Sequence, residues 1–319
     1  MADLWAPSRL TEPIKVSLAS VDGHPLAEAL QRVQGEIDSV FDAFLTVPDD
    51  TRARLVEAMR YAAIGGGKRV RPLLVVSTAE MFGVDRTAAL RAGAAVEAIH
   101  VYSLIHDDLP CMDDDDMRHG KATVHKVYDE ATAVLAGDAL HALAFEILAD
   151  TGTSSDPFVR SELIATLGKA SGMGGMAGGQ MMDMVADEEG VEYDLRAITR
   201  LQQLKTGALL AASVEMGAIL GRIPPEGRAH LRAYSRDIGL AFQIADDLLD
   251  VEGDQEKAGK ALRKDEGQGK QTFVTLMGRD KAREQARALV DQAVAHLGSH
   301  GSEADTLRAL AQFIVERDF

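Results

Sequence analysis

Apolar residues recur every three to four positions along most of the chain, the spacing that places them on one face of a helix. This pattern predicts helices over residues 25–45, 51–64, 85–106, 131–150, 156–171, 196–221 and 227–250, and through the last forty residues. Alternation of single apolar and polar residues, which would predict β-strands, is not found over any convincing length.

Glycine and proline cluster between these segments, at 65–72, 151–157, 172–179 and 221–227. Both residues interrupt helices, so we interpret each cluster as a break. No low-complexity linker divides the chain. The sequence therefore predicts one all-α domain over residues 26–319, with roughly ten or more helices, after a loose N-terminal arm at residues 1–25.

Composition narrows the possible partners. The 319 residues carry a formal net charge of −16 and are 46% hydrophobic, which is enough for a sizeable core. The acidic balance argues against nucleic acid, whose phosphates need a basic face. The single cysteine, Cys111, excludes an intrachain disulfide and fits a reducing compartment. No apolar run approaches the ~18 residues of a membrane span and no apolar signal core is found, so we expect a cytoplasmic protein.

Two predicted helices end in aspartates. Six aspartates lie within residues 107–116. Asp107 and Asp113 flank Pro110, which should end or distort the helix and could bring the two carboxylates together. In the second cluster, Asp246 and Asp250 are four residues apart and share a helix face, with Asp247 beside them.

Crowded carboxylates raise one another's pKa values unless a cation neutralises them. Oxygen ligands favour Mg²⁺ or Ca²⁺ over Zn²⁺, and Mg²⁺ completes its shell with water and substrate phosphates. Other interpretations stay open. An exposed acidic loop would explain Asp114 to Asp116, whereas a calcium loop lacks the EF-hand spacing. A metal phosphohydrolase centred on His106 and Asp107 lacks obvious further histidines nearby.

A basic complement follows a glycine run, where Lys68 and Arg71 lie three residues apart at a helix start that suits a phosphate. The spacing is not that of a Walker loop, and a solvated helix start is the alternative. Lys205 lies within a long apolar segment, where it could equally reach out to solvent. Further candidates are Lys260 and Lys270, in a glycine-rich loop, and His100, two turns before the first cluster.

Six motifs together resemble the trans-prenyltransferases, and most closely the bacterial farnesyl diphosphate synthases. They are "GGGKRVRP", "HVYSLIHDDLPCMDDDDMRHGKATVH", "LAGDAL", "GGQMMDM", "KTGALL" and "GLAFQIADDLLDVEGD", in this order from about residue 30 onward. The resemblance implies an all-α isoprenoid-synthase fold, a helical bundle around a central apolar cavity, and usually a homodimer.

The resemblance also implies the site residues. Three Mg²⁺ ions, for which Mn²⁺ can substitute, would join an allylic diphosphate to Asp107, Asp108, Asp113, Asp183, Asp246, Asp247 and Asp250. The same diphosphate would be clamped by Arg118, Lys205 and Lys260, with Lys270 nearby. Thr206, Gln243 and the carbonyl of Lys205 would stabilise an allylic cation. Isopentenyl diphosphate would bind Lys68, Arg71 and His100, with His119 beside them.

The implied activity is condensation of isopentenyl diphosphate with dimethylallyl and geranyl diphosphates to farnesyl diphosphate. Geranylgeranyl diphosphate or another short-chain product is the alternative. Product length would depend on Tyr102, which lies about 7.5 Å along the helix axis from Asp107 and would block the hydrocarbon tunnel. The adjacent Ser103 is small. Tyr102 could instead be a core aromatic that faces another helix.

Three positions depart from the family pattern. His119 replaces a second arginine, which could weaken binding of isopentenyl diphosphate or make it depend on pH. Ala122 replaces the usual proline, and Arg317 is the one basic residue close to the C-terminus.

Two other classes of protein remain as competitors. A terpene cyclase shares the fold but needs no isopentenyl site, so Lys68, Arg71 and His100 argue against it. A non-catalytic regulatory subunit is disfavoured because both aspartate clusters are intact.

Overall fold

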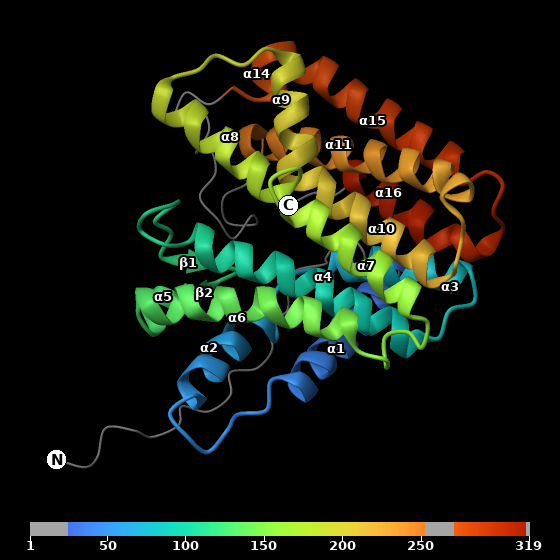
Figure 1. Ribbon diagram of the computed structural model, residues 1–319. Helices are drawn as coiled ribbons and strands as arrows, with labels where there is room; N and C mark the ends of the chain where they lie inside the picture. Colours follow the sequence, from blue (N-terminus) through green and yellow to red (C-terminus); the bar gives the residue numbers. More distant parts are fainter. Residues whose placement is uncertain (1–24, 253–270, 317–319) are drawn as a thin grey trace.

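The computed structural model describes residues 25–252 and 271–316, and within them the chain is almost wholly helical (Figure 1). The helices are α1 (Pro25–Phe44), α2 (Ala53–Ala63), α3 (Val70–Met81), α4 (Arg86–Asp107), α5 (Val124–Val127), α6 (Glu130–Ala149), α7 (Pro157–Ser171), α8 (Met176–Glu189), α9 (Leu195–Gln202), the π-helical turn η1 (Gln203–Gly207), α10 (Ala208–Leu220), η2 (Pro225–Arg228), α11 (Ala229–Glu252), α14 (Phe273–Met277), α15 (Arg279–His296), η3 (Ser302–Ala304) and α16 (Asp305–Glu316). The prediction of an all-α fold is confirmed.

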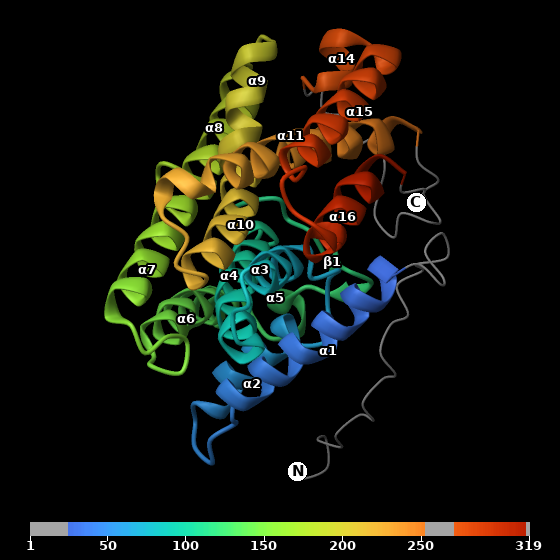
Figure 2. The same ribbon diagram turned by 90° about the vertical axis from the view of Figure 1, so that its right-hand side faces the viewer.

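Helices α3, α4 and α10 form the middle of the bundle. α4 packs against α6, α3 and α1, while α10 packs against α3, α7 and α11. Figure 2 shows α3, α4 and α10 near the centre, with the other helices around them. The buried apolar side chains of the described residues form one continuous core. A charged residue that points inward from α3 or α4 is therefore surrounded by apolar packing and needs a partner.

Helices α4 and α6 meet the length and composition of a membrane span, a possibility that the sequence pattern did not indicate. They lie side by side in the bundle (Figure 1), and 61% and 50% of the residues in their apolar windows are buried within it. Core helices satisfy the same criteria, so this is weak evidence for a membrane span.

The glycine cluster at 172–179 contains the predicted break, because α7 ends at Ser171 and α8 begins at Met176, but its last two glycines, Gly178 and Gly179, lie within α8. A Cβ on Gly179 would lie 2.2 Å from the backbone nitrogen of Lys205, and one on Gly178 would lie 2.0 Å from the carbonyl oxygen of Met173. These glycines permit close approach of two backbones rather than ending a helix. The predicted helices include neither α3 nor α8, although the sequence indicates the start of α3.

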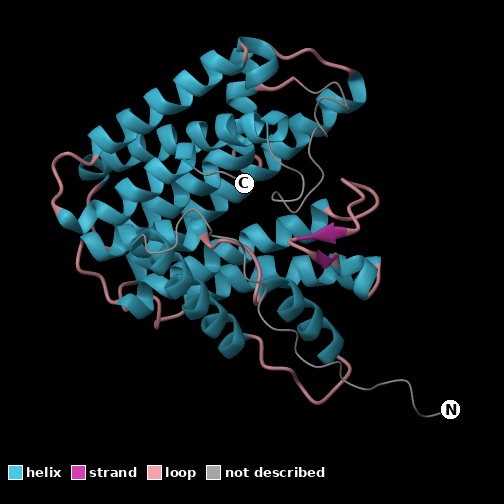
Figure 3. Cartoon of the chain, turned by 180° about the vertical axis from the view of Figure 1, so that it is seen from behind, coloured by secondary structure: helices cyan, strands magenta, loops and turns pink. Residues whose placement is uncertain are grey.

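A two-residue hairpin leads from the first acidic cluster to α5 (Figure 3). Strand β1 (Met117–Arg118) pairs antiparallel with β2 (Lys121–Ala122). The turn residues His119 and Gly120 have φ values of 51° and 74°, as a type I′ turn requires. The hairpin fixes Arg118 beside the acidic cluster and holds His119 in a left-handed conformation.

Candidate active site

The first acidic cluster forms where α4 ends at Asp107. The chain turns at Pro110, and the Asp113 amide donates a hydrogen bond of 2.8 Å to the Asp107 carbonyl. Burial raises the pKa of Asp107 to about 6; Lys205 opposes the rise and the charge of Asp113 adds to it. The expectation that Pro110 brings Asp107 and Asp113 together is confirmed.

Asp108 and Arg118 are engaged with each other. Arg118 Nε donates to Asp108 Oδ1 at 2.8 Å, and its Nη2 donates to the same oxygen and, at 3.3 Å, to Asp115. Asp108 is 3% exposed. Burial raises the pKa of Asp108, and the bonded Arg118 opposes that rise. In this state Arg118 holds the acidic loop, and both residues would have to rearrange to meet a metal or a substrate.

Lys205 lies in η1, where the helix widens to a π-turn, a feature frequent at functional sites. Its Nζ lies 2.5 Å from Asp183 Oδ2 on α8. Gly179, one turn before Asp183, allows α8 to come this close. Lys205 is therefore ion-paired beside the acidic cluster rather than extended into solvent.

One face of α11 carries the second cluster. Gly239, Gln243, Asp246 and Asp250 follow a spacing of four, three and four residues, which aligns them along the helix. A Cβ on Gly239 would lie only 3.4 Å from the Gly207 Cα, so this face abuts the π-turn. The structure thus brings the second acidic cluster and Gln243 to the helix face that packs on the turn containing Lys205 and Thr206.

Asp247 and Asp250, in the second acidic cluster, differ in their hydrogen-bond partners. Asp247 is 9% exposed, and its Oδ2 accepts the backbone amide of Phe273 at 2.7 Å, which ties α11 to α14. The Oδ2 of Asp250 is buried and has no hydrogen-bond partner among the described residues. A buried carboxylate oxygen without a partner is costly unless a cation or donor arrives.

The residues predicted to bind isopentenyl diphosphate, Lys68, Arg71 and His100, lie on α4 and at the start of α3. Burial lowers the pKa of Arg71, while the carboxylates of Glu97 and Asp246 favour its charged form. The Nε of Arg71 is buried without a hydrogen-bond partner in the described part of the chain. Burial and the neighbouring Arg71 lower the pKa of His100 well below its usual value, so this imidazole is neutral at pH 7.

His119 lies in the same group. Burial is the main cause that lowers its pKa, followed by Arg118, and Lys68 also contributes. The side chain is therefore neutral at pH 7 and acts as a polar group rather than a cation. This corrects the expectation of an ordinary pKa near 6.5 at this position.

These carboxylates fit a metal that is completed by substrate. Among the residues that the structure describes, no three His, Cys, Asp or Glu side chains converge to hold an ion. This is unlike a zinc or EF-hand site, but it agrees with Mg²⁺, which takes one or two carboxylates and then substrate phosphates. The raised pKa of Asp107 and the unpartnered oxygen of Asp250 mark carboxylates that a cation would stabilise.

Tyr102 packs between α4 and α6. Its ring meets His106 edge-on at a centroid distance of 5.7 Å and His141 at 5.0 Å. This is the contact with another helix that the alternative interpretation describes, and its role as a tunnel floor stays a prediction. Ser103 bonds back to the carbonyl of His100 at 2.8 Å.

His106 is turned away from the acidic cluster. Its Nε2 lies 3.1 Å from the Val134 carbonyl on α6, and a Cβ on Gly137 would collide with the imidazole. This orientation disfavours a phosphohydrolase centred on His106 and Asp107.

Three predicted residues, Lys260, Lys270 and Arg317, lie outside the described residues. Sequence reasoning also missed residues that surround the site. Glu97 is a charged residue inside an apolar helix, one turn before His100, and that contrast is a signal that could have identified it. His141 gave no signal of its own, and Gly179 was recognised only as part of a glycine cluster and of the motif "GGQMMDM", because the roles of both residues depend on contacts between helices.

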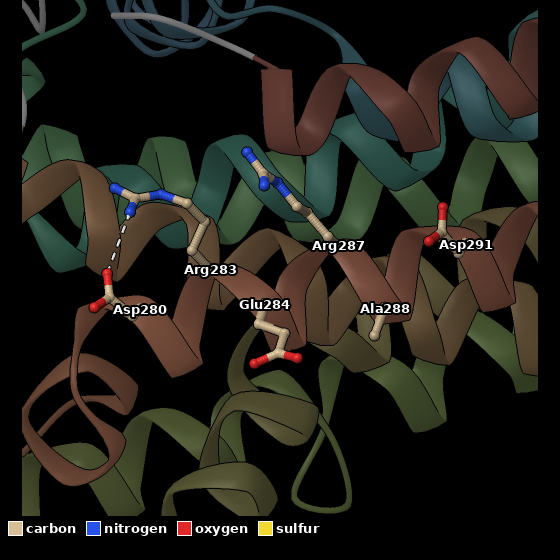
Figure 4. Close-up of a pocket in the computed structure, with 6 residues that line it drawn as sticks. All are labelled: Asp280, Arg283, Glu284, Arg287, Ala288 and Asp291. Atoms are coloured by element: carbon tan, nitrogen blue, oxygen red, sulfur yellow. Dashed lines mark ion pairs between the residues drawn. The ribbon is translucent and has the colours of Figure 1, made fainter.

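A separate shallow hollow lies on α15 (Figure 4). All of its lining residues come from that one helix, and charges of both signs alternate along it: Asp280, Arg283, Glu284, Arg287, Ala288 and Asp291. Asp280 and Arg283 are 3.8 Å apart. This is a solvated helix face with weak ion pairs, and it shares no residue with the candidate site.

An all-α bundle with two acidic clusters, an adjacent lysine and a separate basic group defines an enzyme of the isoprenoid-synthase class. The polyprenyl synthetase family model matches residues 52–312, and the chain belongs to this family of prenyltransferases.

Individual relatives agree with this assignment. A farnesyl diphosphate synthase of Escherichia coli is 45% identical over 83% of this chain and 89% of its own length. A chloroplastic geranylgeranyl pyrophosphate synthase of Catharanthus roseus is 44% identical over 83% of this chain and 74% of its own. The crystal structure of an FPP/GFPP synthase from Zymomonas mobilis is similar with a TM-score of 0.84 and 59% identity, covering 91% of this chain and 98% of that one.

Proposed function

We propose that this protein condenses isopentenyl diphosphate with dimethylallyl and geranyl diphosphates to give farnesyl diphosphate, in a Mg²⁺-dependent reaction. The observation that carries the proposal is that the acidic cluster of α11 lies within electrostatic reach of Arg71, in a basic group distinct from both acidic clusters. This arrangement would give two diphosphates of different roles adjacent but separate places to bind. The relatives named farnesyl diphosphate synthase support the same reaction.

Within this proposal the carboxylates divide into two groups. Asp107, Asp113 and Asp250 are the first candidates to hold Mg²⁺, and Asp246 shares a face of α11 with Asp250. Asp108, Asp183 and Asp247 would first have to release the protein partners described above. Bound Mg²⁺ would supply Lewis-acid stabilisation of the charge on the leaving diphosphate.

The side chains around the clusters would do the rest. Lys205 would exchange Asp183 for a diphosphate oxygen of the allylic substrate. As the allylic C–O bond breaks, the hydroxyl of Thr206 and the amide of Gln243 would stabilise the cation through their dipoles. The double bond of isopentenyl diphosphate, held on Lys68, Arg71 and His100, attacks that cation. The proton lost would go to the departing pyrophosphate, while the apolar helices exclude water that would quench the cation.

A longer product is the second candidate. The Zymomonas mobilis protein is named an FPP/GFPP synthase, and the Catharanthus roseus relative is a geranylgeranyl pyrophosphate synthase. Similar proteins are thus named for products of different length. C20 and C25 products must therefore be measured beside C15.

The decisive experiment incubates purified protein with Mg²⁺, labelled isopentenyl diphosphate and geranyl diphosphate, then separates the dephosphorylated products. We expect C15 alcohol, and no product when a chelator removes the metal. Cyclic hydrocarbon would indicate a terpene cyclase, and phosphate release alone a hydrolase. Absence of any chain extension would contradict the proposal.

We further propose a cytoplasmic homodimer whose protomers each form a single domain over residues 26–319. Large apolar side chains exposed at adjacent positions of α6 support an interface: Val134 is 39% exposed and Leu135 is 56% exposed. Light scattering coupled to size exclusion would test this. A monomer at micromolar concentration would contradict the proposed dimer.

A further inference from the structure

A buried arginine lies between two of the residues predicted to bind isopentenyl diphosphate. Arg69 lies between Lys68 and Arg71, directly before α3, and only 1% of its side chain is exposed. A guanidinium so enclosed cannot serve as a surface contact for a substrate. Its role must lie in what it holds.

Three helices supply the partners of Arg69. Its Nη1 donates to Glu97 on α4 at 2.7 Å, and its Nη2 donates to Asp38 on α1 at 2.7 Å. The same Nη2 donates to the carbonyl of Ala63, the last residue of α2, at 2.5 Å. Asp38 in turn accepts the amide of Gly65 at 3.1 Å. The glycine turn is thereby fastened to α1, α2 and α4 through one side chain.

The backbone of Arg69 is the joint between Lys68 and α3. Its φ of 53° is left-handed, which is unfavourable for a residue with a Cβ. Such conformations persist when the surroundings over-determine them. The ion pairs of the side chain do this here, so they also fix the torsion that sets Lys68 relative to Arg71.

Glu97 interacts electrostatically with both Arg69 and Arg71. Its carboxylate bonds to Arg69, yet it is close enough to Arg71 to stabilise that charge too. The side chain of Glu97 is 4% exposed. If Arg69 were lost, Glu97 would be a buried charge without its bonded partner, and Arg71 would be drawn to neutralise it.

We propose that Arg69 is the positioning residue of the isopentenyl diphosphate site: it neutralises Glu97 and fixes the glycine turn, so that Arg71 stays available to the diphosphate and Lys68 stays in register with it. The inference rests on the proposed function, because that function supplies the ligand. It assigns to Arg69 no contact with substrate.

The test is binding of isopentenyl diphosphate, measured by titration calorimetry without an allylic partner, so that no reaction occurs. In Arg69→Gln we expect a Kd at least about tenfold higher, the factor that one charge-assisted hydrogen bond is typically worth. In steady-state assays the KM for isopentenyl diphosphate should rise, while the KM for geranyl diphosphate and the kcat stay near wild type. Adding Glu97→Gln to Arg69→Gln removes the competing carboxylate and should recover part of the affinity, while the part that depends on the fastened glycine turn stays lost.

Arg228 provides a matched control. It is likewise buried, its Nη1 bonds to Glu162 at 2.7 Å and to Glu215 at 3.1 Å, and its Nε bonds to the Ile223 carbonyl. Arg228→Gln should lower the Tm without changing the Kd. If Arg69→Gln does not fold, Asp38→Asn and Arg69→Lys each weaken the same network and should raise the Kd by a smaller factor.

Wild-type affinity in Arg69→Gln, or in both milder variants if it does not fold, would overturn the inference. So would an equal loss for both substrates, or no recovery in the double variant. Failure of the proposed function is distinct, because it would appear as absent chain extension by the wild-type protein.

Discussion

Lys205 Nζ and Asp183 Oδ2 are 2.5 Å apart, so a lysine expected to grip a diphosphate is paired with an aspartate expected to bind metal. The pair keeps both charges satisfied until substrate and metal arrive together.

We expect Asp183→Asn to raise the Mg²⁺ concentration for half-maximal activity by about tenfold, as loss of a metal-supporting carboxylate typically does. The measurement is a Mg²⁺ titration of activity. Asp194→Asn, which removes only the acid that caps α9, is the control. Identical titrations for Asp183→Asn and wild type would contradict a role for Asp183 at the metal.

Asp107 should trade stability for function. Its pKa in the folded protein is about 6, above the ~3.9 of an unfolded chain, so ionising it opposes folding. The favourable contribution of Asp107 to the free energy of unfolding is fully present below about pH 4 and is lost as the pH rises through 6. Without divalent ions at pH 7.5, Asp107→Asn should therefore be more stable by about 1 to 3 kcal/mol, while its kcat falls by orders of magnitude. Denaturant unfolding at pH 7.5 and pH 4 tests this, and the gain should vanish at pH 4. A less stable variant at pH 7.5 would refute the assignment.

His119→Arg should strengthen binding of isopentenyl diphosphate. With an ordinary pKa, His119 would make the benefit larger at pH 8 than at pH 7. Burial and Arg118 lower its pKa, so it is neutral at both values and the benefit should be equal. We expect the KM for isopentenyl diphosphate to fall by about tenfold. His119→Asn stays neutral and tolerates the left-handed φ of 51°, so its KM should match wild type. An unchanged KM in His119→Arg would place this residue away from the diphosphate.

Tyr102 and Ser103 face different sides of α4, which lets product length be tested on both. Ser103 is four residues before Asp107 and lies about 40° from it around the axis, whereas Tyr102 is about 140° away. If Tyr102 is the floor, Tyr102→Ala should shift products from C15 to C20 or longer. If the tunnel follows the Asp107 face, Ser103→Phe should shorten the product to C10. Chromatography of dephosphorylated products decides. A C15 distribution in Tyr102→Ala would remove Tyr102 as the determinant.

Gly179 should tolerate no side chain. A Cβ there would lie 2.2 Å from the Lys205 nitrogen, an overlap with backbone that flexible atoms cannot relieve. Gly179→Ala should cost about 3 kcal/mol or more. Gly174, in the same glycine cluster, has nothing within 4 Å of its Cβ position, so Gly174→Ala should be close to neutral. Urea unfolding of the two variants gives the comparison, and similar stabilities would contradict the close approach of α8 and η1.

The parts of the molecule that sequence predicts well are those governed by local pattern. The periodicity found α1, α2, α4, α6, α7 and α11, and the effect of Pro110 on Asp113 followed from proline geometry. Other features depend on distant contacts. The role of Gly179 depends on where η1 packs, and the π-turn at Lys205 has no signature in a run that reads as one continuous helix.

Dependence on distant contacts also explains why the role of Arg69 could not be predicted from the sequence. Arg69 was passed over between Lys68 and Arg71 because nothing local separates a buried arginine from an exposed one. Its carboxylate partners come from α1 and α4, and Asp38 precedes it by 31 positions in the chain. Ligand-dependent roles, such as those of Asp108 and Asp247, are set by whichever partner is present at a given moment.

The π-turn at Gln203–Gly207 also bears on how such a site can arise. A π-turn closes over one more residue than an α-turn, so it can be regarded as a single-residue insertion in a helix that would otherwise run straight from α9 into α10. The residues on either side would keep their buried faces if that residue were removed. A one-codon insertion into a structural helix would then suffice to create the lysine-bearing bulge, and the surrounding bundle would not need a new topology to acquire chemistry at this position.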